Sequence, residues 1–197
     1  MPAVALSMRQ ISFWRDWWWC WRLARDPVVV AGTLSARGRP PGLWRHMRWM
    51  LRWSGRGRSR QAHVIEIELI GGGLSRRRRC GLWRVAYSPA TDLCEVSLAL
   101  HRDYRGLGIG RRILRDASNV AHECGLRLHA RILLGNRASL RAFRRAGYRV
   151  VGVAGRGEDG TPPHYHLVYE PSSVRPPGMW YDWPGDGRNN KKKIPEA

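Results

Sequence analysis

The spacing of apolar residues along the chain predicts four helices. A tryptophan stripe at i, i+3, i+4 and i+7 marks the first, over 14–26, and apolar residues at helical spacing mark the second, over 43–54. The clearest helix covers 110–124, where six apolar residues share one face and Gly125 supplies the C-terminal stop. A fourth, short helix follows Asn136, which is a good N-cap residue.

Runs of β-branched and other apolar residues lie between and after these helices. They predict six strands, over 64–70, 82–87, 95–100, 126–134, 149–153 and 164–169. The arginine run Arg76 to Arg79, beside a triple glycine, is expected at a solvated hairpin tip. Strands and helices therefore alternate over most of the chain, which favours a mixed α/β fold with one twisted sheet.

The length and composition predict one globular domain. The chain has 197 residues, of which 43% are apolar and 25% charged, and this length excludes two large domains. We expect an N-terminal arm over 1–12, a domain over 13–170 and a tail over 171–197. Proline, glycine and all the lysines gather in the last of these segments, which is therefore expected to be a poorly ordered basic tail.

The net charge is strongly positive. The sequence has 35 basic residues and 15 acidic ones, which gives a formal charge of +20. Such a chain attracts polyanions, phosphorylated ligands or acidic surfaces, and the sign alone does not choose among them. Most of the basic residues are arginines, an imbalance that a GC-rich genome also produces. Because no nucleic-acid module aligns these charges, any binding to RNA or DNA is expected to be non-specific.

The cysteines and the apolar runs bear on metal binding and on location. The four cysteines stand far apart, with no CxxC pair and no histidine at metal spacing, so we expect no metal site. No apolar run approaches the roughly 18 residues that a membrane span needs, and no signal-peptide core is found. Thiols without a disulfide framework fit a reducing cytoplasm, which is the expected location.

The segment Arg105-Gly106-Leu107-Gly108-Ile109-Gly110 lies between a predicted strand and a predicted helix. Glycines at alternate positions let the backbone turn tightly near a ligand, and the free N–H groups of the next helix point at the turn. Such a turn suits a pyrophosphate. A dinucleotide fold would carry its glycines after the first strand, and a Walker A motif would continue with Gly-Lys-Ser/Thr. This chain has neither feature.

These residues resemble the signature of the GNAT superfamily of acyl-CoA-dependent N-acyltransferases, which is Gln or Arg, two residues, Gly, one residue, Gly. Arg105, Gly108 and Gly110 match this signature. A second match follows after one helix and one strand, at Asn136 to Ser139, Phe143 and Ala146 to Tyr148. The resemblance therefore covers about residues 95 to 152.

The resemblance implies a fold, a co-substrate and a reaction. The fold is a single domain with a central, twisted, mostly antiparallel sheet, a V-shaped split between two strands and helices on both faces. The reaction is acetyl transfer from acetyl-CoA, without a metal, to the primary amine of a small acceptor. The strand end at 98–100 would line the thioester, and the glycine turn would hold the pyrophosphate. The residues implied in CoA binding are Leu98, Ala99, Leu100, Arg105, Gly106, Leu107, Gly108, Ile109, Gly110, Arg111, Asn136, Ser139 and Phe143.

The N-terminal part is similar, more weakly, to the GNAT branch that acetylates nucleotide-linked amino sugars and to relatives that act on ribosomal-protein N-termini. Asp16, Trp21, Arg22 and His46 carry this similarity. It implies an acceptor pocket at Trp21, Arg22 and His46, with a nucleotide-linked amino sugar as the acceptor. A peptide or ribosomal-protein N-terminus is the alternative acceptor.

The catalytic acid and base depart from the family's pattern. Phe143 stands where many members have the tyrosine that protonates the departing thiolate. Glu95 is the candidate base, because it is the carboxylate closest to a position where relatives carry a glutamate. The alternatives are histidines, since imidazole titrates near neutral pH: His46, His101 and the pair His164 and His166. A CoA-binding scaffold without catalysis and a basic nucleic-acid-binding module also stay open.

Overall fold

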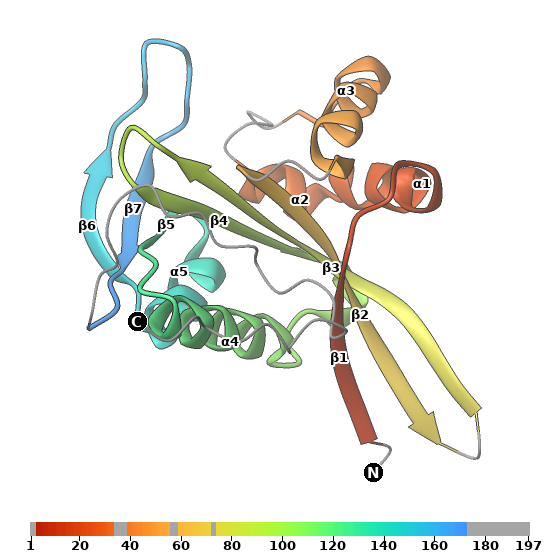
Figure 1. Cartoon of the computed structure of the whole chain (residues 1–197). Helices are drawn as coiled ribbons and strands as arrows, with labels where there is room; N and C mark the ends of the chain where they lie inside the picture. The colour runs from red at the N-terminus through yellow and green to blue at the C-terminus, as the bar shows by residue number, and fades with distance from the viewer. Residues whose placement is uncertain (1–2, 34–38, 56–58, 72–73, 173–197) are drawn as a thin grey trace.

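The computed structural model of the protein describes residues 3–33, 39–55, 59–71 and 74–172 (Figure 1). In these residues seven strands form one sheet, in the order β1-β2-β3-β4-β5-β7-β6. The strands are β1 (Ala3–Gln10), β2 (Arg60–Gly71), β3 (Leu74–Ser88), β4 (Leu93–Leu100), β5 (Leu128–Leu133), β6 (Arg149–Ala154) and β7 (His164–Tyr169). The helices are α1 (Phe13–Ala24), α2 (Pro27–Gly32), α3 (Leu43–Ser54), α4 (Ile109–Glu123) and α5 (Arg137–Arg145), with a short 3-10 helix, η2 (Arg102–Tyr104).

Helices cover both faces of the sheet (Figure 1). On one face α4 and α5 bury the larger hydrophobic core, to which Ile113, Leu114 and Phe143 contribute. On the other face α1 and α3 form a smaller core with β2 and β3, which includes Leu23 and Met50. The single mixed α/β domain with helices on both faces is therefore confirmed.

One pair of neighbouring strands breaks the antiparallel order. β4 and β5 run parallel and pair at two positions, Cys94 with Leu128 and Glu95 with His129. Beyond Glu95 these two fully described strands pair no further, so the sheet opens between them. The V-shaped split that the resemblance implies is present at this point.

A buried ion network holds α1 on the sheet. Asp16 is fully buried and accepts two hydrogen bonds of 2.7 Å from Arg9 of β1. Arg9 also donates to Glu66 of β2 at 2.7 Å, and Arg79 of β3 lies 3.3 Å from Asp16. Burial raises the pKa of Asp16, but these hydrogen bonds and charges outweigh it and hold the pKa below its usual value. Asp16 is thus a structural carboxylate that joins a helix to three strands.

The segment predicted as an N-terminal arm is an edge strand instead. β1 pairs antiparallel with β2 over its whole length. Leu6 and Met8 pack against the larger core, whereas Ala5 and Ser7 are exposed. This alternation has the period of two that is typical of a half-buried strand, and it is present in the sequence.

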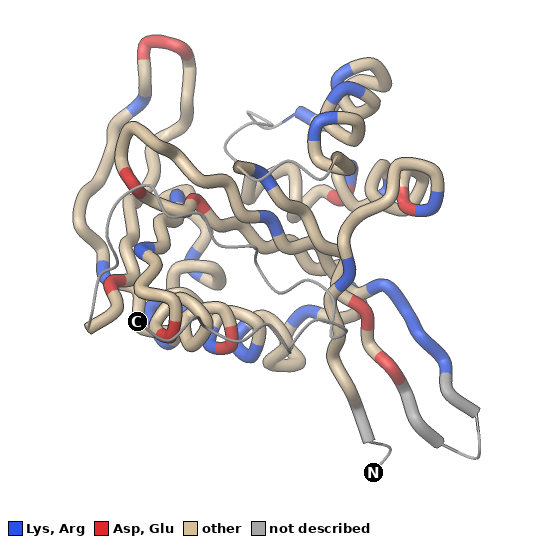
Figure 2. Tube along the Cα trace, viewed as in Figure 1, with Lys and Arg blue, Asp and Glu red and all other residues tan. Residues whose placement is uncertain are grey.

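The arginine run Arg76 to Arg79 lies within β3 and not at a hairpin tip (Figure 2). It pairs with residues 66–69 of β2, and Arg77 lies 3.6 Å from Glu68. Arg76, Arg77 and Arg78 are exposed to solvent, as expected, but the placement at a hairpin tip is wrong because it overlooks the acidic residues on the facing strand.

The four helices predicted from the sequence are present, and the described part of the chain has one further α-helix. α1, α3, α4 and α5 begin and end within a few residues of the predicted positions. The additional helix is α2, which begins at Asp26-Pro27 because the Asp26 carboxylate accepts from the N–H groups of Val28 and Val29. Of the predicted tail over 171–197, all residues from 173 onward lie outside the described residues.

His63 makes the fold sensitive to acid. It is 3% exposed in β2, and burial lowers its pKa from 6.5 to about 4. Between these two values the folded protein keeps His63 neutral while the unfolded chain binds a proton, so stability is lost as the pH falls through this window. We expect this residue to lower stability by about 2 kcal/mol near pH 5 relative to neutral pH.

Urea unfolding at about pH 7.5 and about pH 5 measures this loss. On acidification, His63→Leu should lose about 2 kcal/mol less stability than the wild-type protein, because its unfolded chain has one proton site fewer. His122→Gln changes an exposed residue of α4 and should behave as wild type. An equal acid loss in wild type and His63→Leu would contradict the prediction.

Candidate active site

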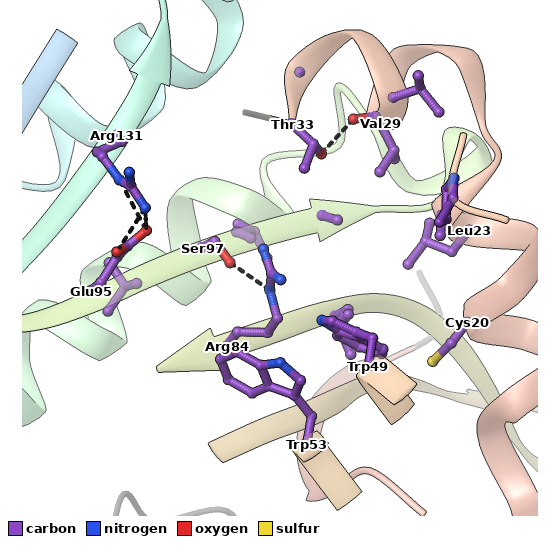
Figure 3. A pocket seen from close by; sticks show the side chains of 18 of the residues that line it. Cys20, Leu23, Val29, Thr33, Trp49, Trp53, Arg84, Glu95, Ser97 and Arg131 are labelled. Atoms are coloured by element: carbon purple, nitrogen blue, oxygen red, sulfur yellow. Dashed lines mark hydrogen bonds and ion pairs between the residues drawn. The ribbon is translucent and has the colours of Figure 1, made fainter. Parts of the chain in front are cut away.

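A pocket of about 550 Å³ lies over the split between β4 and β5, on the face covered by α1, α2 and α3 (Figure 3). Residues of β3, β4 and β5 line it together with residues of these three helices and of α5. Seven of the residues singled out from the sequence are among them: His46, Glu95, Leu98, Ala99, Asn136, Ser139 and Phe143. The fold thus brings CoA-binding candidates, the candidate base and one acceptor candidate to one cavity.

Glu95 lies at the point where β4 and β5 separate. Its carboxylate forms an ion pair with Arg131 of β5, at a shortest distance of 2.8 Å (Figure 3). Both side chains line the pocket. Nη2 of Arg131 donates to both carboxylate oxygens of Glu95, so a proton that Glu95 accepts has to be passed on or has to displace one of these hydrogen bonds.

A row of three histidines continues from this ion pair across β5 and β7. The Nε2 atom of His129 lies 3.1 Å from Nδ1 of His166, and the ring centroids of His164 and His166 are 4.7 Å apart. Burial lowers the pKa of His129 and of His166, so both are neutral at neutral pH and able to accept a proton. The sequence analysis named His164 and His166 but missed His129, although its alternation with Arg131 along one strand indicates a shared face.

Aromatic rings form one wall of the pocket. His46, Trp49 and Trp53 of α3 stack in succession, with ring centroids 5.9 Å and 6.1 Å apart. The Nε2 atom of His46 lies 3.3 Å from the carbonyl oxygen of Trp17, which only accepts, so this nitrogen carries the proton. Trp21 packs against Trp17 and His46 but does not itself line the pocket.

Two further candidates from the sequence lie outside this cavity. Arg22 is exposed on α1 and is not among the lining residues. His101, an alternative base, caps η2 by accepting from the Asp103 N–H at 3.5 Å, and it does not line the pocket either. Of the three acceptor candidates, the pocket includes His46 alone.

The start of α5 forms the wall on the other side of the split. As predicted, Asn136 caps this helix, because its Oδ1 accepts from the Ser139 N–H at 3.1 Å. A Cβ at Gly32 would lie 2.9 Å from Nδ2 of Asn136, so the amide also packs against the end of α2. Phe143 lies edge-on to Tyr148, with ring centroids 4.9 Å apart, and has no proton to give.

The glycine turn forms a second hollow at the start of α4. Gly108 has a φ of 76°, and a Cβ added there would meet nothing within 4 Å, so the first N–H groups of α4 are open to a ligand. The hollow measures about 590 Å³ and is lined by Leu6, Leu107, Gly108, Ile109, Arg111, Arg112, Arg115 and Arg145. Four arginines without a carboxylate in the lining suit a polyphosphate.

Arg105, the first residue of the glycine motif, binds protein groups. Its Nε donates to the Leu100 carbonyl at 2.9 Å, and its Nη2 donates to Oδ1 of Asp26 at 2.7 Å. Burial raises the pKa of Asp26, but the hydrogen bond from Arg105 and those from the helix backbone hold the pKa below its usual value. Arg105 therefore joins the end of β4 to the start of α2 and positions the turn beside the pocket.

Metal sites and membrane helices were sought throughout the described part of the chain. There, no group of three or more His, Cys, Asp or Glu side chains is arranged to hold a metal ion. Within the same residues, no helix has both the length and the apolar character needed to cross a membrane.

The fold and the site define a class of protein, a mixed α/β domain whose sheet splits beside a glycine turn suited to phosphate groups. The model of the Acetyltransferase (GNAT) family matches residues 11–148, which is more than half of the chain. The protein belongs to this family and is an acetyl-CoA-dependent N-acetyltransferase. A comparison with curated proteins found no match.

Solved acetyltransferase structures share this fold. Aminoglycoside acetyltransferase AAC(6')-Ib in complex with coenzyme A has a TM-score of 0.64 and 13% identity, over 84% of this chain and 95% of that chain. Spermidine N-acetyltransferase from Vibrio cholerae, in complex with CoA and spermine, has a TM-score of 0.68 and 11% identity, over 85% and 96%. The microcin C7 self-immunity acetyltransferase MccE, in complex with acetyl-CoA and AMP, has a TM-score of 0.66 and 10% identity, over 84% and 92%. At these identities the likeness is one of fold, and it leaves the acceptor open.

The link between Asp26 and Arg105 yields a stability prediction. Asp26→Ala removes both the cap of α2 and the partner of Arg105, and it should lower the free energy of unfolding by about 1 kcal/mol or more. Asp26→Asn keeps an oxygen for the cap and loses only the charge, so it should be less destabilising. Urea unfolding of both variants at neutral pH measures the difference. If the two variants lose the same stability, the charge pair and not the cap holds α2.

Proposed function

We propose that the acceptor is a small amine carried on a phosphate-bearing group, most simply a nucleotide-linked amino sugar. The supporting observation is the charge of the pocket. Among the described residues that line it, Glu95 is the one carboxylate, whereas five are arginines: Arg45, Arg48, Arg52, Arg84 and Arg131. Such a lining attracts phosphate groups and repels polycations. The aromatic wall adds flat surfaces on which a base or a sugar ring can stack.

The ligands of the solved structures illustrate the choice between a polycationic acceptor and a phosphate-bearing one. Kanamycin, which is bound to AAC(6')-Ib in a further solved structure with coenzyme A, and spermine, which is bound to the spermidine acetyltransferase, are amines with several positive charges. AMP, which is bound to MccE, carries a phosphate. The arginines of this pocket suit a ligand of the second kind and disfavour one of the first kind.

We infer that acetyl-CoA occupies the split, with its pyrophosphate on the turn from Arg105 to Arg111. The open N–H groups beside Gly108 and the arginines around them support this placement. The thioester would then reach the strand end at 98–100, where the β5 side of β4 has no strand partner. The Leu100 carbonyl there accepts from Arg105, so the other unpaired backbone groups of this strand end are the ones open to a ligand. Asn136 lines the opposite wall, from which its side chain would serve the pantetheine arm as well as α5. Acetyl-CoA supplies the activated acetyl group.

The residues of the chain have to free the amine of a proton before it attacks. An amine with a pKa near 10.4 is neutral in only about one molecule in 10³ at pH 7. We propose that Glu95 accepts the proton, because no other carboxylate lines the pocket in the described part of the chain. His129 pairs with Glu95 across the strands and, with His166, can take the proton onward. The amine nitrogen then forms the C–N bond as the C–S bond breaks and CoA leaves as the thiolate. The nitrogen gives up its second proton in this step, which the departing thiolate or solvent takes up.

Two other expectations from the sequence belong to this proposal. We propose a cytoplasmic location, which the four cysteines support because they form no disulfide. Binding to nucleic acid is proposed to be non-specific, because the basic residues are spread over several elements, including α3, β3 and α4 (Figure 2).

A panel assay tests the proposed acceptor. The protein is incubated with acetyl-CoA and, separately, with a UDP-linked amino sugar, spermidine, an aminoglycoside and a peptide with a free N-terminus. Mass spectrometry of the products and release of the CoA thiol measure transfer. We expect acetylation of the UDP-linked amino sugar. Acetylation of the peptide alone, or of the polycations alone, would overturn the proposed acceptor class.

The placement of the pyrophosphate is tested at Gly108. Asn and Asp adopt positive φ with similar ease, so Gly108→Asn and Gly108→Asp differ mainly in charge. We expect Gly108→Asp to bind CoA at least about tenfold more weakly than Gly108→Asn, because the carboxylate repels the pyrophosphate. Calorimetric titration with CoA measures both affinities. Equal affinities in the two variants would place the pyrophosphate elsewhere.

A further inference from the structure

Arg84 lies against a stacked pair of tryptophans, Trp49 and Trp53, on the floor of the pocket (Figure 3). Its guanidinium carbon lies 5.9 Å from the ring centroid of Trp49 and 5.5 Å from that of Trp53. Its Nε donates to Oγ of Ser97 on β4 at 2.8 Å. One of the five N–H donors of the guanidinium is therefore used, and the aromatic faces fix the plane of the group.

Arg84 differs from the partly buried Arg9 and Arg105 in having no carboxylate partner. Arg9 and Arg105 each have a carboxylate oxygen at 2.7 Å. In the described residues no carboxylate lies within ion-pair distance of Arg84, and burial lowers its pKa although the charge of Glu95 opposes this. Since arginine keeps its charge in proteins, the site holds a desolvated cation that an anion would compensate.

The position of Arg84 on β3 would suit an apolar residue. Leu82, two residues before it on the same face, is buried in the core that α1 and α3 form with the sheet. An apolar side chain at position 84 would pack against Trp49 and Trp53 without the desolvation that a cation suffers there. The fold therefore does not require the guanidinium.

We propose that Arg84 binds the anionic group of the acceptor, a phosphate or a carboxylate, and so directs the amine to Glu95. This inference rests on the proposed function. Arg84 of β3 lies opposite Ser97 of β4, and Glu95 is two residues before Ser97 on the same face. Along the strand direction, the backbone positions of Arg84 and Glu95 are therefore roughly 7 Å apart. A compact acceptor, with the anion about one sugar ring from the amine, is able to contact both groups.

Arg84→Met tests this role, because methionine keeps an apolar stem of similar length and removes the charge. Glucosamine 1-phosphate and glucosamine form a matched pair of probes that differ by one phosphate. We expect Arg84→Met to raise the KM for the phosphorylated amine about 10- to 100-fold with little change in kcat, and to leave the unphosphorylated amine unaffected. The KM of Arg84→Lys for the phosphorylated amine should lie between that of the wild-type protein and that of Arg84→Met. Arg78→Gln removes an exposed charge from the same strand and is the control.

The melting temperature separates a binding role from a structural one. If the guanidinium serves a ligand, Arg84→Met should melt at or above the temperature of the wild-type protein, because a desolvated charge is replaced by packing. A large fall in melting temperature, or an unchanged preference for the phosphorylated amine in Arg84→Met, would overturn the proposal.

A binding experiment distinguishes failure of this inference from failure of the proposed function. UDP and, separately, a simple dicarboxylate are titrated by calorimetry into the CoA-saturated protein, so that the CoA phosphate sites are filled. Binding of UDP that Arg84→Met abolishes supports the anion site even if no amino sugar is acetylated. Acetylation of the UDP-linked amino sugar at equal efficiency in both proteins would leave the proposed function standing and refute the anion site.

Discussion

The separation of β4 from β5 after Glu95 is the constraint on which the site depends. Two residue pairs hold these parallel strands together, and beyond them each strand has open backbone groups on the facing side. Arg105 satisfies the Leu100 carbonyl at the open end of the split, and Arg131 reaches across its closed end to Glu95. The pocket is therefore a gap built into the sheet, and the helices above it supply its walls.

Arginine serves this protein in three different settings, which the total charge of the chain does not separate. Arg9 belongs to a compensated network that holds α1 on the sheet, and Arg105 joins two elements through Asp26. In both, a carboxylate offsets the desolvation of the cation. Arg84 has aromatic rings and a hydroxyl around it instead. The charge of Arg9 and of Arg105 is thus offset within the fold, whereas the guanidinium of Arg84 is left open to an anion.

Local signals in the sequence predicted the parts of the fold that local interactions determine. The apolar stripe and the cap at Asn136 identified α4 and α5, and the glycine turn was placed correctly between β4 and α4. Pairing between distant strands could not be predicted from these local signals. β1 and the arginine run of β3 are defined by their contacts with β2. Trp21 was assigned to the acceptor site from the weak resemblance to one GNAT branch, and a resemblance of sequence does not show which rings face a cavity. Arg84 carries no signal of its own, since its tryptophan neighbours come from a distant helix.

The lack of a tyrosine at position 143 is compatible with catalysis because of the leaving group. A thiol with an ordinary pKa near 8.5 departs as a thiolate far more readily than an amine or alcohol would, so a proton donor contributes less here. Cys20, the thiol in the pocket lining, has a pKa that burial raises to about 12, so it stays protonated and does not compete as a nucleophile. Positive charge nearby lowers the energy of a departing thiolate. We infer that the arginines that favour a phosphate-bearing acceptor also stabilise this sulfur, in place of the missing acid.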